Sequence, residues 1–276
     1  MEKHLLTVRD LRISFRGAAG MFDAVRGVSF DLGREKLGIV GESGSGKSMT
    51  GRAIMRLSPP AAIVSAEQIR LGETDILHAS EKTMDAIRGR RIGLIMQDPK
   101  FSLNPVVTVG EQIAEAYRIH TRSSAAQARD KAIAMLGAVQ IRDPERVYRM
   151  YPHEMSGGMG QRIMIAMMLV SEPEILIADE ATSALDVTVR LEILNLLNDL
   201  VQKRGLGLIF ISHDLNLVRR FCDRVLIMYR GRVVETLKAS ELEDATHPYT
   251  RGLLDAMPRI HAQRRRLPVL QRDASW

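Results

Sequence analysis

Short apolar runs alternate with longer segments of helical periodicity along most of the chain. Runs of this length, bounded by glycine and polar residues, are typical of buried strands. They occupy residues 37–40, 92–96, 175–178, 208–211 and 224–228. Because strands and helices alternate in order, the pattern predicts an α/β fold with a largely parallel sheet.

The first thirty residues follow a different pattern. Residues 5–8, 11–15 and 28–31 alternate between apolar and polar positions, which predicts strands of an antiparallel layer. Near the end of the core, Tyr229-Arg230-Gly231-Arg232 lies between two apolar runs and predicts a tight hairpin.

Between Phe101 and Met155 no strand pattern occurs. Residues 109–120 and 124–139 read as helices, alanine-rich and broken by polar turns. We therefore expect an inserted helical subdomain here. From about Ala239 onward the sequence predicts short helices and then a tail.

Composition limits location and chemistry. The chain of 276 residues has one cysteine, Cys222, which excludes an internal disulfide and a multi-cysteine metal site. The longest apolar runs, such as residues 164–170, are far shorter than the ~20 residues that span a bilayer. No basic-then-apolar start resembling a signal peptide follows Met1, so we expect a reducing cytoplasm.

The net charge of +6 is unevenly distributed. The last twenty residues hold one acidic side chain, Asp273, and five arginines: Arg259, Arg264, Arg265, Arg266 and Arg272. Nucleic acid, an anionic membrane surface or a partner protein can use such a cluster. No aromatic platform for base stacking is interleaved with the arginines, which favours a solvated tail.

The most informative motif is Gly41-Glu42-Ser43-Gly44-Ser45-Gly46-Lys47-Ser48, which fills every fixed position of the phosphate-binding loop pattern GxxxxGK[ST]. It follows the strand at 37–40 and precedes a helix-like stretch at 48–57. Glycines let backbone N–H groups and a helix N-terminus face an anion. Lys47 would neutralise the β- and γ-phosphates, and Ser48 would ligate Mg²⁺. The chain is predicted to bind a nucleoside triphosphate.

Two acidic residues, Asp179 and Glu180, follow directly on the strand at 175–178. A carboxylate at such a strand tip can hold Mg²⁺ beside a phosphate loop, which suits Asp179. Glu180 can polarise the water that attacks the γ-phosphate. An acidic pair alone is typical of a solvated loop start, but downstream of a phosphate loop it predicts a hydrolytic site.

A third motif, Met155-Ser156-Gly157-Gly158-Met159, opens a helix shortly before the acidic strand. It resembles the LSGGQ signature of ATP-binding cassette (ABC) ATPases. A helix N-terminus with a serine hydroxyl suits phosphate, and in the family it completes the nucleotide site of the opposite subunit. Met155 and Met159 replace the usual leucine and glutamine, and Ala181 stands where proline commonly follows Glu180.

Other elements of the same family occur in order. Gln97 resembles the Q-loop glutamine, Ser183-Ala184-Leu185-Asp186 the D-loop, and His213 the switch histidine. The resemblance extends from about Leu5 to Pro258.

The resemblance implies a P-loop NTPase core of the RecA-like type with an N-terminal antiparallel β layer, an inserted α-helical subdomain and a short C-terminal extension. An ABC ATPase domain would cover residues 1–258, with its ATP-binding core at 1–98 and 160–238 and the helical subdomain at 99–159. An extension of the oligopeptide-transporter type would follow at 239–276.

The resemblance also implies roles for individual residues. ATP would be bound by the loop from Gly41 to Met49 and by Ser156, Gly157 and Gly158. An aromatic from the early β region would stack on adenine, and Phe15 and Phe22 are equal candidates for this role and for core packing. The expected Mg²⁺ ligands are Ser48, Gln97 and Asp179, and the expected catalytic residues are Lys47, Gln97, Glu180 and His213.

Three segments resemble the ATPases of peptide and nickel importers in particular. They are Gln97-Asp98-Pro99 with Ser102-Leu103-Asn104-Pro105, Tyr151-Pro152-His153-Glu154, and His247-Pro248-Tyr249-Thr250-Arg251. The implied protein is an ATP hydrolase that powers uptake of di- or oligopeptides, with nickel or another metal chelate as the alternative cargo. Its substrate class is not visible in the sequence, because the ATPase does not touch the cargo.

The implied partners are a second ABC ATPase in a homo- or heterodimer, two membrane permeases and an extracytoplasmic substrate-binding protein. The location would be peripheral, at the cytoplasmic face of the bacterial inner membrane. Nucleic-acid- or ribosome-associated ABC ATPases usually have tandem cassettes, zinc-binding insertions or long coiled coils, which this sequence lacks, so no nucleic acid is expected. Lipid and drug exporters often fuse a membrane domain and lack the His247-Pro248-Tyr249 element.

Overall fold

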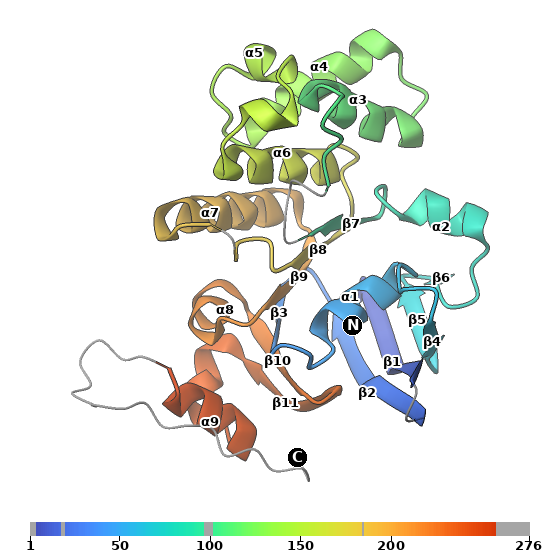
Figure 1. Cartoon of the computed structure of the whole chain (residues 1–276), viewed down its shortest axis with the longest axis vertical. Helices are drawn as coiled ribbons and strands as arrows, with labels where there is room; N and C mark the ends of the chain where they lie inside the picture. The colour runs from blue at the N-terminus through green and yellow to red at the C-terminus, as the bar shows by residue number, and fades with distance from the viewer. Residues whose placement is uncertain (1–3, 18–19, 97–101, 184, 258–276) are drawn as a thin grey trace. The chain divides into compact units, whose positions relative to one another are not determined.

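The structure is a computed structural model that describes residues 4–17, 20–96, 102–183 and 185–257. The described residues form two compact units, one from those within 4–79 and 209–257 and the other from those within 80–208 (Figure 1). The domain boundaries expected from the sequence remain a prediction.

The first unit begins with an antiparallel sheet, as the alternating pattern predicts. β1 (Leu6–Gly17) and β2 (Gly20–Leu32) pair antiparallel. Three short strands extend this sheet: β4 (Ala62–Ser65) and β5 (Gln68–Leu71) pair with β1, and β6 (Thr74–Asp75) pairs with β5.

The alternating runs at 5–8 and 11–15 belong to one strand, because β1 continues through the polar positions between them. Asp10 adopts a positive φ of 47°, and the register with β2 shifts between Val8 and Leu11. The Asp10 N–H donates to Ser29 Oγ at 2.9 Å, so the bulge keeps a hydrogen bond and the strand does not end.

The first unit also contains a second group of strands, in the order β11-β10-β3-β9. β10 (Arg224–Tyr229) runs parallel to β3 (Lys36–Val40) and antiparallel to β11 (Arg232–Lys238). β9 (Gly207–Ser212) belongs to this unit from Ile209 onward. The strands predicted at 37–40, 208–211 and 224–228 are confirmed.

The predicted hairpin at Tyr229-Arg230-Gly231-Arg232 is also confirmed. Tyr229 pairs with Arg232, and the two turn residues have φ values of 45° and 83°. Two positive φ angles in a two-residue loop match the right-handed twist of the strands.

Helices follow the strands of the first unit. They are α1 (Lys47–Ile54), α8 (Leu215–Phe221), the 3₁₀ helix η3 (Ala239–Asp244) and α9 (Pro248–Asp255). α8 packs closely on β3, because a Cβ on Gly38 would lie 2.3 Å from the side chain of Val218. The Phe221 ring also meets Phe210 of β9 edge-on, with centroids 5.0 Å apart.

The second unit has two parallel strands and several helices. β7 (Ile92–Ile95) pairs with β8 (Ile175–Asp179) from Ile92 opposite Ile175. The helices are α2 (Glu81–Ile87), α3 (Val109–His120), α4 (Ala125–Ala138), α5 (Pro144–Tyr148), η2 (Pro152–Glu154), α6 (Gly157–Leu169) and α7 (Val187–Arg204).

The helical stretch predicted after residue 100 is confirmed for the described residues 102–155, which contain no strand. The N-terminal ends of its two longest helices are set by capping side chains. Thr108 caps α3, and Ser124 forms a capping box with Gln127 at the start of α4. Among the described residues, no helix is long and apolar enough to cross a membrane.

Candidate functional site

The phosphate loop connects β3 to α1 in the first unit, and two of its glycines are required by their surroundings. A Cβ on Gly41 would lie 2.1 Å from the carbonyl oxygen of Met228. Gly46 has a φ of +99°, and a Cβ there would lie 2.6 Å from the carbonyl oxygen of Ala24. The neighbouring strands therefore dictate the loop path, and only glycine fits at these two positions.

Backbone hydrogen bonds hold the loop in place. The N–H of Gly231, in the β10–β11 turn, donates to the Ser45 carbonyl at 3.0 Å. The same glycine accepts from the N–H of Arg26 in β2 at 2.7 Å. At the start of α1, the Thr50 N–H and hydroxyl both donate to the Gly46 carbonyl. The hairpin turn thus links the loop to both β layers of the unit.

Lys47, the first residue of α1, is only 5% exposed. Its Nζ donates to the carbonyl oxygens of Gly41 and Glu42, both at 2.8 Å. These bonds hold the ammonium group against the loop and beside the N-terminus of α1. A fixed positive charge next to backbone N–H groups at a helix N-terminus is an arrangement that binds phosphate.

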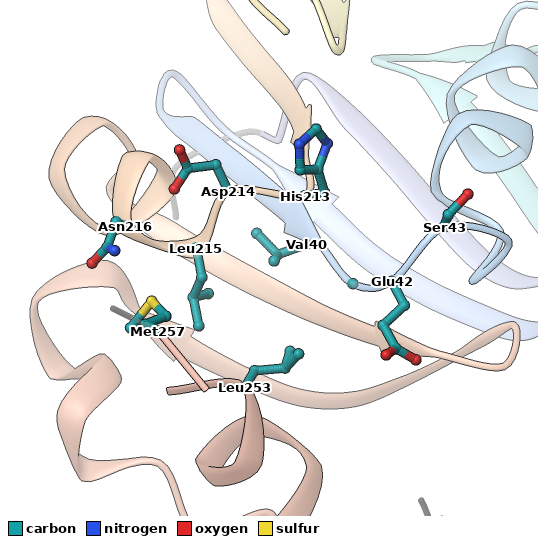
Figure 2. A pocket seen from close by; sticks show the side chains of 10 residues that line it. Val40, Glu42, Ser43, His213, Asp214, Leu215, Asn216, Leu253 and Met257 are labelled. Atoms are coloured by element: carbon teal, nitrogen blue, oxygen red, sulfur yellow. The ribbon is translucent and has the colours of Figure 1, made fainter. Parts of the chain in front are cut away.

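A pocket of about 680 Å³ lies beside the first half of the loop. Figure 2 shows His213 at one side of this pocket, Glu42 and Ser43 of the loop at another, and Leu253 and Met257 from the C-terminal part of the unit below. The complete lining is Val40, Gly41, Glu42, Ser43, His213, Asp214, Leu215, Asn216, Leu253 and Met257. The structure therefore brings His213 and the first half of the phosphate loop to one pocket.

His213 follows β9 and is exposed. Two side-chain hydrogen bonds fix the backbone around it. The Asp214 N–H donates to Ser212 Oγ at 3.0 Å, and Asp214 Oδ1 accepts from the Leu217 N–H at 3.0 Å and so caps α8. The imidazole is thus presented from a rigid strand-to-helix connection.

The acidic pair lies in the second unit, at the end of β8. Asp179 is the last residue of this fully buried strand and is 7% exposed. Glu180 has a φ of 50°, an unusual backbone conformation for a residue other than glycine. The N–H and hydroxyl of Ser183 donate to the Glu180 carbonyl at 3.1 and 3.0 Å and hold this turn. Strained backbone that the surroundings maintain is typical of functional sites.

The signature motif opens α6, also in the second unit. Ser156 caps the helix and accepts from the Met159 N–H at 3.4 Å. Gly157 is exposed, and a Cβ there would meet nothing within 4 Å. Gly158 instead faces Val189 of α7, because a Cβ would lie 2.7 Å from its side chain. The predicted helix start at Ser156 is confirmed.

The two candidate aromatics form a cross-strand pair, with Phe15 of β1 directly opposite Phe22 of β2. Phe22 is 59% exposed, so core packing, one of its two expected roles, is wrong for this side chain. Phe15 is half-buried. Met21 and Ile63 of the same sheet are also exposed, and they lie opposite Arg16 and Ser14, on the other face from the phenylalanine pair.

Residues 41–49, His213, Phe15 and Phe22 therefore belong to the first unit, and Ser156, Gly157, Gly158, Asp179 and Glu180 to the second. Gln97 lies outside the described residues, as do Asp98, Pro99 and the arginines of the tail. The sequence motifs gave no role to Gly231, and they gave Tyr249 only a subfamily resemblance. For Gly231, the sequence predicted only that the residue lies in a tight hairpin.

The chain is similar to several known proteins. A family model described as ABC transporter matches residues 25–183. A probable peptide ABC transporter ATP-binding protein of Sinorhizobium fredii is 51% identical, over 96% of this chain and 81% of the relative. The oligopeptide transport ATP-binding protein OppD of Bacillus subtilis is 48% identical, over 94% of this chain and 73% of the relative.

A similar solved structure is the dimeric post-hydrolysis state of an ATP-binding cassette bound to ADP and Pi. It superposes with a TM-score of 0.76 at 25% identity, covering 85% of this chain and 98% of that chain.

Proposed function

The chain belongs to the ABC transporter family, and we propose that it is the ATP-hydrolysing subunit of a bacterial peptide importer. The observation that carries the proposal is the phosphate loop, in which strand packing selects Gly41 and Gly46 and backbone carbonyls hold a buried Lys47. This loop binds the phosphates of ATP through N–H groups, the α1 N-terminus and the lysine charge.

Ser48, Asp179 and Gln97 would hold Mg²⁺. Hydroxyl, carboxylate and amide oxygens are the hard ligands that this ion prefers, and the Asp179 carboxylate comes from a rigid, buried strand end. When bound, Mg²⁺ would neutralise charge on the β- and γ-phosphates.

Glu180 acts as the general base that orients and deprotonates the attacking water. The turn held by Ser183 fixes its backbone immediately after Asp179. His213, which lines the same pocket as Gly41, Glu42 and Ser43, would contact the γ-phosphate or the water. Together with Lys47, these groups would supply the positioning and electrostatic stabilisation that account for most of phosphoryl-transfer catalysis, and Glu180 would add general-base catalysis.

The active form is a dimer of cassettes, as homodimer or heterodimer. The exposed α6 N-terminus at Ser156 and Gly157 offers its N–H groups to the nucleotide of the opposite subunit. The dimeric cassette with ADP and Pi bound, to which the chain is similar, supports this proposal. ATP favours the closed dimer by binding it more tightly, and hydrolysis reopens it.

The cargo is a di- or oligopeptide, a proposal supported by the names of the two relatives. Nickel import and a role on nucleic acid or ribosomes are not favoured, because neither relative is described in those terms. The assembly would include two permeases and an extracytoplasmic binding protein, with the chain peripheral at the cytoplasmic face of the inner membrane. The segment 97–105 is our candidate for the permease contact.

The test uses a tagged Glu180→Gln variant expressed in the native host. Membranes are solubilised with MgATP present, and the co-purifying proteins are identified by mass spectrometry. We expect two permeases and a second cassette chain, which is a different protein if the dimer is a heterodimer. Lys47→Ala is the control and should not retain the closed assembly. Recovery of ribosomes or DNA-bound proteins without permeases would refute the proposal.

A further inference from the structure

The motifs of the proposed ATPase site assign no role to the His247-Pro248-Tyr249 element, although this element contacts the phosphate loop. Tyr249 is fully buried in α9. Its hydroxyl accepts a hydrogen bond from the backbone N–H of Glu42, the second residue of the loop, at 3.1 Å. A residue far along the chain thus contacts the loop directly.

The start of α9 is anchored so that this contact is fixed. Glu235 of β11 accepts from the N–H groups of Thr246 and His247, at 2.8 and 3.2 Å. The His247 side chain then caps the helix, its Nδ1 accepting from the Tyr249 N–H at 3.2 Å, and Pro248 occupies the first turn.

The Tyr249 ring is held separately from its hydroxyl. It packs against the Tyr229 ring at the end of β10, with centroids 4.4 Å apart. One turn further along α9, Leu253 lines the pocket beside the loop together with Glu42. The ring packing orients the Tyr249 side chain, and the hydroxyl makes the hydrogen bond to Glu42 in addition.

Glu42 connects this tyrosine to the lysine of the loop. Its N–H donates to the Tyr249 hydroxyl, and its carbonyl accepts from Lys47 Nζ at 2.8 Å. The same residue is therefore bonded on both sides, once to the C-terminal helix and once to the phosphate-binding ammonium group.

We propose that Tyr249 is a positioning residue for ATP binding, which holds Glu42 so that the Glu42 carbonyl orients Lys47. The inference rests on the proposed function, since it deepens the account of the same phosphate loop. It gives the His-Pro-Tyr element a physical role, in which the histidine caps α9, the proline starts it and the tyrosine hydroxyl fixes the loop.

The test is Tyr249→Phe in the full chain, which keeps the ring and removes only the hydroxyl. Thr250→Val is the matched control, because Thr250 is also fully buried, lies one residue further along α9 and has its hydroxyl near Glu235. The readouts are the equilibrium Kd for MgATP, the KM of hydrolysis, the Tm and the hydrogen exchange of the Glu42 amide.

Loss of one neutral hydrogen bond should raise the Kd and KM of Tyr249→Phe roughly 2- to 10-fold. The Glu42 amide should also exchange faster in Tyr249→Phe. Thr250→Val should keep the wild-type Kd, KM and Glu42 exchange rate, even if its Tm falls as much as that of Tyr249→Phe. Wild-type Kd and Glu42 exchange in Tyr249→Phe would overturn the inference, and so would equal losses in both variants. If wild-type chain fails to bind MgATP, or binds it equally after Lys47→Ala, the proposed function itself is refuted.

Discussion

Two glycines of the phosphate loop offer a matched pair of substitutions, Gly46→Ala and Gly44→Ala. Both residues have positive φ, +99° and +80°. They differ in the space around them, because a Cβ on Gly46 would lie 2.6 Å from the carbonyl oxygen of Ala24, whereas one on Gly44 would meet nothing within 4 Å.

The expected difference in Tm follows from the cost of the left-handed backbone and the cost of the steric contact. A left-handed backbone costs an alanine about 1–2 kcal/mol, and this cost applies to both variants. The contact with a backbone oxygen adds about 1–3 kcal/mol to Gly46→Ala alone, as for other overpacked sites. At about 2–4 °C per kcal/mol for a chain of this size, Gly46→Ala should melt roughly 2–12 °C below Gly44→Ala.

The assay is thermal unfolding of the full chain, followed by titration with MgATP. Because any shift that relieves the clash moves the residue before Lys47, Gly46→Ala should also bind MgATP more weakly than Gly44→Ala. Equal Tm values for the two variants would refute the claim that Ala24 dictates the path of the loop.

Three further results are expected. Glu180→Gln should bind MgATP like wild type but turn over about 10²–10⁴-fold more slowly in a steady-state ATPase assay, and unchanged turnover would exclude it as the general base. Burial raises the pKa of the Cys222 thiol, so iodoacetamide at pH 8 should label it only after unfolding in urea, and rapid native labelling seen by mass spectrometry would contradict its placement. Burial opposes ionisation of Glu235, but the Thr250 hydroxyl and the N–H groups of Thr246 and His247 outweigh it and hold its pKa below the ordinary value. The ionised carboxylate therefore stabilises the fold fully at pH values above the ordinary pKa, and this contribution is lost as the pH falls through the lowered pKa. In urea titrations, the excess stability of wild type over Glu235→Gln should therefore shrink between pH 7 and strongly acidic pH.

The sequence predicted the parts of the fold that depend on local pattern. The apolar strand before the phosphate loop, the helix starts at Ser156 and Ser124, and the turn at Gly231 all carry short-range signals, namely buried runs, capping side chains and a two-residue turn. These elements lie where the pattern placed them.

Other features depend on contacts between distant residues and had no local signal. The continuity of β1 depends on a bulge at Asp10 that bonds to Ser29 on the next strand. The bond from Glu42 to Tyr249 joins residues 207 positions apart, so the sequence showed the tyrosine but not its target. The exposure of Phe22 follows from its place near the end of the hairpin where β1 connects to β2, rather than from its apolar character.

The most direct test of the central claim is uptake of labelled di- and oligopeptides by cells of the native host in which the gene is deleted. Complementation with wild type should restore ATP-dependent uptake, and Glu180→Gln expressed at the same level should not. Uptake that is unaffected by the deletion, or that both versions restore equally, would contradict the account of this chain as the ATPase of a peptide importer.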